Sequence, residues 1–165
     1  MIDAAFGLRY FGAIFAIMNP LVVLPLFLAL TAGLTPADQR RAGLAVTFYS
    51  AVMCAAVAIG GAAILTFFGI GIEDFRVAGG LVLAGIALSM LNGTGNPVHE
   101  GAPGETTAAP DPAVTAFYPL TFPMVVGPGT ITTLLVFAHE AGTVAERVTF
   151  WAVTAAMLAL LGLVL

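Results

Sequence analysis

Two apolar stretches of the chain are interrupted by proline and carry small polar residues at the interruption. The first is interrupted at Asn19-Pro20 and the second at Gly127-Pro128-Gly129. Proline has no amide hydrogen, so each interruption leaves a carbonyl without its helical partner. In an apolar environment such carbonyls must pair with other protein groups or line a wet cavity that holds an ion or a solute. The residues predicted to bind a solute are Asn19, Pro20, Pro25, Gly127, Pro128, Gly129 and Thr130.

These residues also have a purely structural interpretation, because small and hydroxylated residues are common where two helices cross closely. For any single glycine or threonine we favour that interpretation. The two proline interruptions lie at equivalent positions of an internal repeat, which is described below. For the two interruptions taken together, we favour a binding site. Asn19 is the strongest single candidate, because a carboxamide inside an apolar helix requires a hydrogen-bonding partner.

Other kinds of chemistry have little support in the sequence. The interiors of the long apolar stretches contain no charged residue, which argues against a voltage sensor or a relay of intramembrane carboxylates. No histidine lies within them to serve Ser50 or Ser89 as a general base. His99 is not followed by a second histidine four residues later, as a zinc protease motif requires. We therefore expect no catalytic residue, no metal and no cofactor, and we expect the chain not to be an enzyme.

The composition indicates the solvent in which these stretches lie. Apolar residues make up 60% of the chain and charged residues only 8%, with a mean hydropathy of +1.06, outside the range of soluble domains. Each uncharged stretch is long enough for a helix of about 20 residues to cross about 30 Å of hydrocarbon. The stretches lack the alternation of barrel strands, so the predicted fold is all-α, a polytopic transmembrane helix bundle. Its spans are expected at about 6–31, 44–68, 75–92, 114–138 and 148–165.

Two pairs of landmarks recur at one spacing along the chain. Thr35 and Thr143 each begin a helix-start pattern, with an acidic residue three positions later. The separation of these two threonines in the sequence equals that of Pro20 and Pro128. The repeated unit contains three spans, and an odd number of spans reverses the second copy relative to the membrane. We therefore predict an inverted repeat of three-helix units whose helices 1 and 4 are broken by Pro and Gly.

The repeat divides the chain into three parts. They are a first three-helix repeat at 1–92, a flexible linker rich in Gly and Pro at 93–113, and a second, incomplete repeat at 114–165. The copy of the third span would fall at about 183–200, beyond Leu165. We therefore expect the natural protein to have a sixth helix that this sequence lacks.

Charge limits the partners of the chain. A net charge of −4, with no lysine and no basic patch, argues against nucleic acid, so the expected partners are the lipid bilayer and a small neutral solute. The first apolar stretch has the length of a span and no basic leader, so we expect it to stay as the first span. The Arg40-Arg41 pair favours a cytoplasmic position for the next loop and hence an N-terminus outside. The sequence leaves the oligomeric state open, with a homo-oligomer among the alternatives.

The two proline interruptions occur together with the segment Phe75-Arg76-Val77-Ala78-Gly79-Gly80 in the third apolar stretch. In these features the chain resembles the MarC family of bacterial and archaeal integral membrane proteins over nearly its whole length. The resemblance implies six spans in the cytoplasmic membrane, a relation to small exporters of the lysine-exporter type, and transport of neutral amino acids by some members. Two features depart from the family: the sixth span is missing, and the linker, which should be cytoplasmic, contains no basic residue. The motifs that carry the resemblance are Ile17-Met18-Asn19-Pro20, Phe75-Arg76-Val77-Ala78-Gly79-Gly80 and Gly127-Pro128-Gly129-Thr130-Ile131.

Together the residues and the resemblance predict a multi-pass permease or exporter of small neutral solutes, amino acids above all, in the bacterial plasma (inner) membrane. The alternative is a non-transporting membrane assembly or regulatory subunit. In that protein the broken helices would serve only to pack the bundle.

Overall fold

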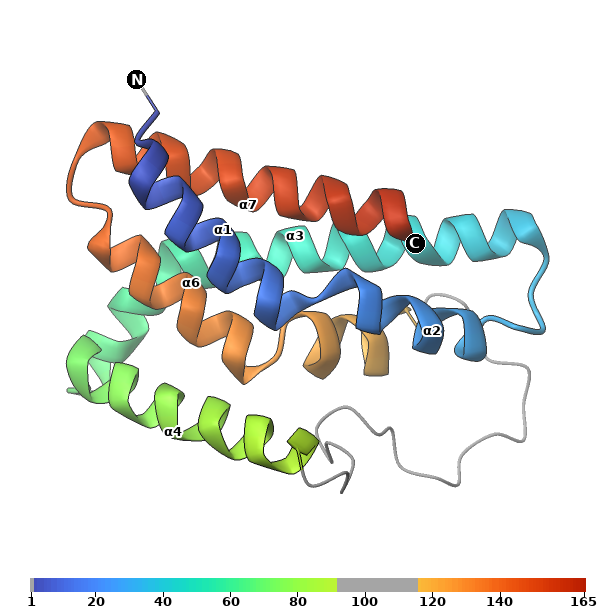
Figure 1. Cartoon of the computed structure of the whole chain (residues 1–165), viewed down its shortest axis with the longest axis horizontal. Helices are drawn as coiled ribbons and strands as arrows, with labels where there is room; N and C mark the ends of the chain where they lie inside the picture. The colour runs from blue at the N-terminus through green and yellow to red at the C-terminus, as the bar shows by residue number, and fades with distance from the viewer. Residues whose placement is uncertain (1, 92–115) are drawn as a thin grey trace.

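A computed structural model describes residues 2–91 and 116–165, and the described residues form helices joined by short connections (Figure 1). The expected linker at 93–113 lies outside the described residues, so the predicted division into two repeats and a linker is not tested there. The helices are α1 (Ala4–Met18), α2 (Pro20–Leu30), α3 (Pro36–Phe67), α4 (Ile72–Leu91), the irregular helix η1 (Ala116–Val125), α6 (Pro128–Glu140) and α7 (Val144–Val164).

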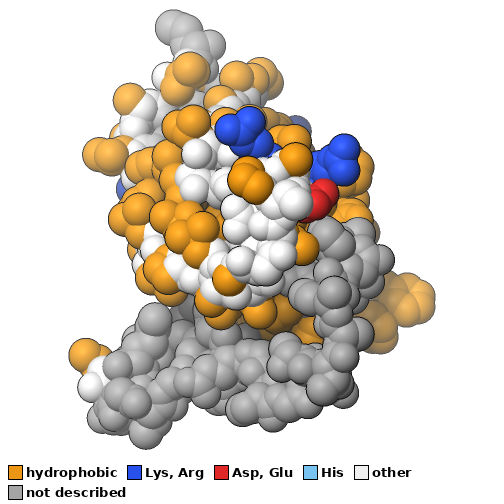
Figure 2. Space-filling view, turned by 90° about the vertical axis from the view of Figure 1, so that its right-hand side faces the viewer, with side chains coloured by type: hydrophobic (Ala, Val, Ile, Leu, Met, Phe, Trp, Pro, Cys, Tyr) orange, Lys and Arg blue, Asp and Glu red, His pale blue; other side chains and the backbone are white. Residues whose placement is uncertain are grey.

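Three helical segments are long and apolar enough to cross a membrane: Ala4–Leu30, Pro36–Phe67 and Val144–Val164. The pair η1 and α6, bent by 57°, adds a fourth if it is counted as one broken span. Figure 2, which faces the right-hand end of Figure 1, shows hydrophobic side chains over much of the described surface and few charged ones. Such a surface suits lipid and not water, so the chain is a multi-pass membrane protein with the predicted all-α fold.

The boundaries differ from the predicted ones where a cap fixes the helix start. The second span begins at Pro36 and not near residue 44, and the fifth begins at Val144 and not near residue 148. Both polar first turns extend the helix beyond the apolar stretch from which the spans were predicted. The third expected span is the helix α4, which is not among the three segments that meet the criteria for a membrane span in the described residues.

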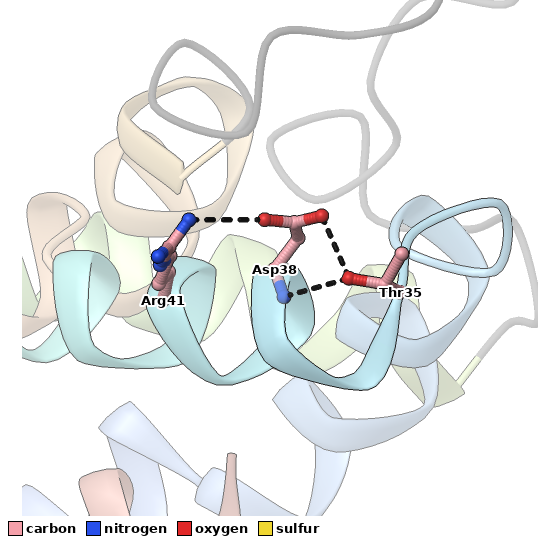
Figure 3. A network of polar contacts seen from close by, with 3 residues as sticks. All are labelled: Thr35, Asp38 and Arg41. Carbon is pink, nitrogen blue, oxygen red and sulfur yellow. Dashed lines mark hydrogen bonds and ion pairs between the residues drawn. The ribbon is translucent and has the colours of Figure 1, made fainter.

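The two helix starts predicted from Thr35 and Thr143 are confirmed. The Thr35 hydroxyl accepts a hydrogen bond from the Asp38 amide and donates one to its carboxylate, and Arg41 completes this exposed network at 3.5 Å (Figure 3). Thr143 forms the full capping box with Glu146. Each cap pairs amides that the first turn of a helix cannot pair itself.

Aromatic packing joins the first helix to the last two. The ring of Tyr10 on α1 lies 4.9 Å from that of Phe137 on α6 and 4.9 Å from that of Phe150 on α7. The Tyr10 and Thr154 hydroxyls share a hydrogen bond of 2.8 Å, which satisfies the polar end of this fully buried ring. The core of the bundle therefore connects the N-terminal and C-terminal parts of the chain directly.

The directions of the helices agree with an inverted repeat. A side-chain carbon on Gly43 would lie 3.2 Å from Leu165, and one on Gly162 would lie 3.0 Å from Thr47, so α3 and α7 run antiparallel. These helices are equivalent under the spacing of the repeat, because their capping threonines are one of the two pairs that define it. Equivalent helices that run in opposite directions require inversion of the second copy, and a parallel repeat would give the opposite result.

The neighbours of each helix follow the same symmetry. In the inverted repeat α1 corresponds to η1, α2 to α6 and α3 to α7. The contact between α1 and α7 therefore corresponds to the contact between η1 and α3, and both are present. In the same way, the contact between α1 and α6 corresponds to the contact between η1 and α2. The helix α4 packs against α6.

One close contact and one ion pair hold α4 on α6. Gly79 lies directly against the side chain of Thr132, and the Arg76 guanidinium is 2.9 Å from the Glu140 carboxylate. Glu140, the last residue of α6, thus pairs with a cation from another helix. The absence of a side chain at Gly79 lets the two helices approach.

We expect Gly79→Ala to destabilise the bundle by about 1–3 kcal/mol, because the new methyl group would overlap the branched side chain of Thr132. The hydroxyl of that threonine is already bonded to the Pro128 carbonyl, so it has little freedom to move. The change in the free energy of unfolding is measured by adding SDS to each variant in a mild detergent and following the loss of helix by circular dichroism. Gly80→Ala is the matched control, since a side chain there meets nothing within 4 Å. Equal stability of the two variants would contradict this packing.

Candidate functional site

The first break separates α1 from α2 at a single residue. Asn19 has φ 34° and ψ 77°, in the left-handed region that asparagine tolerates better than most residues. Its amide still donates to the Phe15 carbonyl, and its own carbonyl accepts from the amides of Val22 and Val23 at 3.0 and 3.2 Å. The backbone thus turns within one residue while most of its hydrogen bonds are kept.

The second break lies between η1 and α6 and is more irregular. Tyr118 and Phe122 have extended backbone inside η1, and each precedes a proline, which disfavours helical backbone at that position. Gly127 then has extended backbone and starts α6. A side-chain carbon on Gly127 would collide with the carbonyl oxygen of Pro123, so only glycine fits there.

Both breaks start a helix inside the bundle, and neither start has a side-chain cap. Asn19 makes no capping hydrogen bond for α2, and Gly127 has no side chain with which to cap α6. By contrast, Asp3, Thr35 and Thr143 cap α1, α3 and α7. Backbone carbonyls pair part of each first turn, since Asn19 accepts from Val22 and Val23 and Gly127 accepts from Ile131. Only the remaining first-turn amides of α2 and α6 are left for another partner.

Hydroxyl groups satisfy carbonyls around the second break. The Thr130 hydroxyl donates to the Val125 carbonyl at 2.8 Å, across the break. The Thr121 hydroxyl donates to the Ala116 carbonyl at 2.8 Å and lies 3.4 Å from the Val46 carbonyl oxygen on α3. These buried threonines pair carbonyls in the irregular backbone around the second break.

The sequence of these breaks and spans matches a known family. The model of the MarC family integral membrane proteins matches residues 5–165. The chain belongs to this family. The break at Asn19 and the break at Gly127 both lie inside the matched region, as do all seven described helices except the first residue of α1.

Several relatives of this MarC family chain are membrane proteins of bacteria and archaea. A UPF0056 membrane protein of Methanocaldococcus jannaschii is 32% identical over 146 residues, which are 88% of this chain and 70% of the relative. The UPF0056 membrane protein YvbG of Bacillus subtilis is 34% identical over 79% of this chain and 62% of its own length. The UPF0056 inner membrane protein MarC of Escherichia coli is 32% identical over 80% and 60%. The chain thus spans about two thirds of the length of these relatives, and no solved structure matches it.

The predicted site residues of this MarC family member fall into two groups. Pro20, Gly127, Gly129 and Thr130 are buried at the two breaks, and Asn19 is half-buried beside them. Pro25, inside α2, and Pro128, at the start of α6, are exposed. Contacts of α1 with α6 and of α2 with η1 bring the two breaks into one part of the bundle. That they line one cavity stays a prediction.

Two buried hydroxyls near the breaks were not predicted to belong to the site. Thr121 lies between the two prolines of η1, and that position could have indicated its role, because a hydroxyl in irregular backbone often pairs a nearby carbonyl. Ser50 on α3 is fully buried, and its hydroxyl has no hydrogen-bonding partner among the described residues. No local pattern around Ser50 distinguishes it from a packing serine.

We expect Gly127→Ala to destabilise the protein by about 1–3 kcal/mol, because the added carbon and the Pro123 carbonyl oxygen cannot occupy the same space. The yield of monodisperse protein in size-exclusion chromatography should fall, together with the thermal midpoint. Gly12→Ala on α1 is the control, since its side chain meets nothing within 4 Å, and it should be neutral or stabilising. A Gly127→Ala variant as stable as the control would mean that the second break is built differently.

Proposed function

We propose that this MarC family chain forms the transporting core of an inner-membrane permease for small neutral solutes, with amino acids as the first class to test. One observation carries the proposal: α2 and α6 start inside the bundle without a side-chain cap, whereas side chains cap the starts of α1, α3 and α7. Helices broken near mid-membrane, at equivalent places of an inverted repeat, are the usual position of substrate sites in secondary transporters.

The chemistry of the two helix starts suits a carboxylate. Backbone amides and the partial positive charge at the beginning of α2 and α6 favour a negatively charged group. The carbonyls freed on the other side of each break, such as that of Ala16 opposite Pro20, would favour an ammonium group. A zwitterionic amino acid carries both groups, and its recognition by backbone needs no charged side chain in the spans.

The membrane and the orientation belong to the same proposal. One relative is named an inner membrane protein, which supports the same location for this chain. The Arg40-Arg41 pair in the first turns of α3 supports a cytoplasmic position for that helix start, and therefore an N-terminus on the outer side.

The test is uptake and efflux of radiolabelled glycine, alanine and a wider panel of neutral solutes by vesicles that contain the purified protein. We expect Asn19→Gly to weaken apparent affinity about fivefold, by the loss of one hydrogen bond of about 1 kcal/mol. Glycine is chosen as the replacement for Asn19 because it can keep the left-handed backbone, so that only the carboxamide is lost. Gly129→Val should nearly abolish transport, since its side chain blocks approach to the first turn of α6.

Gly12→Ala serves as the matched control and should transport normally. Circular dichroism of each variant separates loss of transport from loss of folding. If the unmodified protein moves no solute of the panel, the proposal fails in favour of the non-transporting subunit. If it transports and both site variants transport equally well, the breaks serve packing only.

A further inference from the structure

Ser50 on α3 carries a buried hydroxyl that has no partner among the described residues. Its side chain is fully buried, and its hydroxyl forms no hydrogen bond with any described residue. It shares one helix face with Val46 and Cys54, which are also fully buried. An unpaired buried hydroxyl costs stability, whereas alanine would fill nearly the same space at no such cost. Packing alone therefore does not explain a serine here.

The register of α3 against α7 places Ser50 level with the symmetry axis of the repeat. Gly43 lies against Leu165, and the two helices run antiparallel. Ser50 comes seven residues after Gly43, so it is level with Leu158, which comes seven residues before Leu165. Leu158 is also the residue that the spacing of the repeat makes equivalent to Ser50. Equivalent residues that lie level with each other must flank the axis that relates the two halves.

The second break begins close to the level of Ser50. Thr121 contacts Val46, and Leu135 lies directly against Gly61, so the segment formed by η1 and α6 runs parallel to α3. That register places Ser50 level with the last turn of η1. The uncapped start of α6 follows immediately after this turn.

The first break lies a short way beyond the same level. Asp3 is bonded to Thr149 and Tyr10 to Thr154, so α1 runs parallel to α7. The residue of α1 that is level with Leu158 and Ser50 therefore lies one turn after Tyr10. Asn19 follows a little more than one turn later. Along the bundle, Ser50 is therefore within about one to two turns of both uncapped helix starts.

We propose that the Ser50 hydroxyl is a substrate-binding group at the centre of the transport path, and this inference rests on the transport function proposed above. A hydroxyl both donates and accepts, so it can bond the carboxylate or the ammonium group of an amino acid. Its position near the axis keeps it close to both breaks. It can therefore keep contact with a zwitterion while either half of the bundle opens.

The first test measures access to position 50 without measuring transport. Cys54 is the only cysteine of the chain, so Ser50→Cys combined with Cys54→Ala gives a protein with one thiol at position 50. Vesicles containing it are treated with 2-aminoethyl methanethiosulfonate. The unmodified protein is the matched control, because Cys54 is equally buried on the same face one turn away. We expect about tenfold faster labelling at position 50, slowed by excess alanine or another solute that the protein transports.

The second test separates a binding role from a packing role. Ser50→Ala should lower the apparent affinity for the transported solute about tenfold, while the thermal midpoint stays unchanged or rises. Cys54→Ala should leave both quantities nearly unchanged. A packing serine would give the reverse for Ser50→Ala, with a lowered midpoint and normal transport.

The outcomes distinguish this inference from the proposed function. Labelling at position 50 as slow as at Cys54, or normal affinity of Ser50→Ala in a protein that transports, overturns the role of Ser50 and leaves the permease intact. Fast labelling that a solute slows supports the binding site even if no net transport is seen, in which case the transport function fails alone.

Discussion

The structure depends on one constraint, which is that backbone amides and carbonyls inside an apolar bundle must be paired within the protein. Unbroken helices meet it by their own hydrogen bonds. The breaks at Asn19 and Gly127 cannot, so the chain supplies other donors around them. Thr130 and Thr121 donate to carbonyls of the second break, while the Asn19 backbone bonds in both directions across the first. Where such pairing is incomplete, as for part of the first turns of α2 and α6, the proposed permease would use the unpaired amides to bind its solute.

The sequence alone was sufficient for the features that depend on local chemistry. The uncharged stretches predicted the helices, the threonine patterns predicted the starts of α3 and α7, and the prolines predicted both breaks. These features follow from solvent, capping and a missing amide, each of which acts within a few residues. The boundaries failed where a polar first turn extended a helix beyond its apolar stretch, because hydropathy does not register a cap.

The features that depend on tertiary packing could not be predicted from the sequence. Arg76 and Glu140 are far apart in the chain and form an ion pair only because α4 lies on α6. The unpaired state of Ser50 depends on the absence of partners on the neighbouring helices that the structure describes, which no local pattern encodes. The same holds for Thr121, whose contact with the Val46 carbonyl requires that η1 lie beside α3. The repeat was the one long-range feature within reach, since its spacing fixes which helices are equivalent.

The two breaks also explain why the repeat is so faint in the sequence. At the first, a side chain is present, and the left-handed backbone of Asn19 makes the turn within one residue. At the second, the turn extends over η1 and requires that Gly127 have no side chain, because the Pro123 carbonyl occupies the space. Each solution starts a helix inside the bundle with a proline at its first position, and neither provides a cap. The two breaks therefore share the proline and the absent cap, but each way of turning the backbone requires a different residue before the proline. Identity between the halves can decay to these few positions while the fold keeps its symmetry.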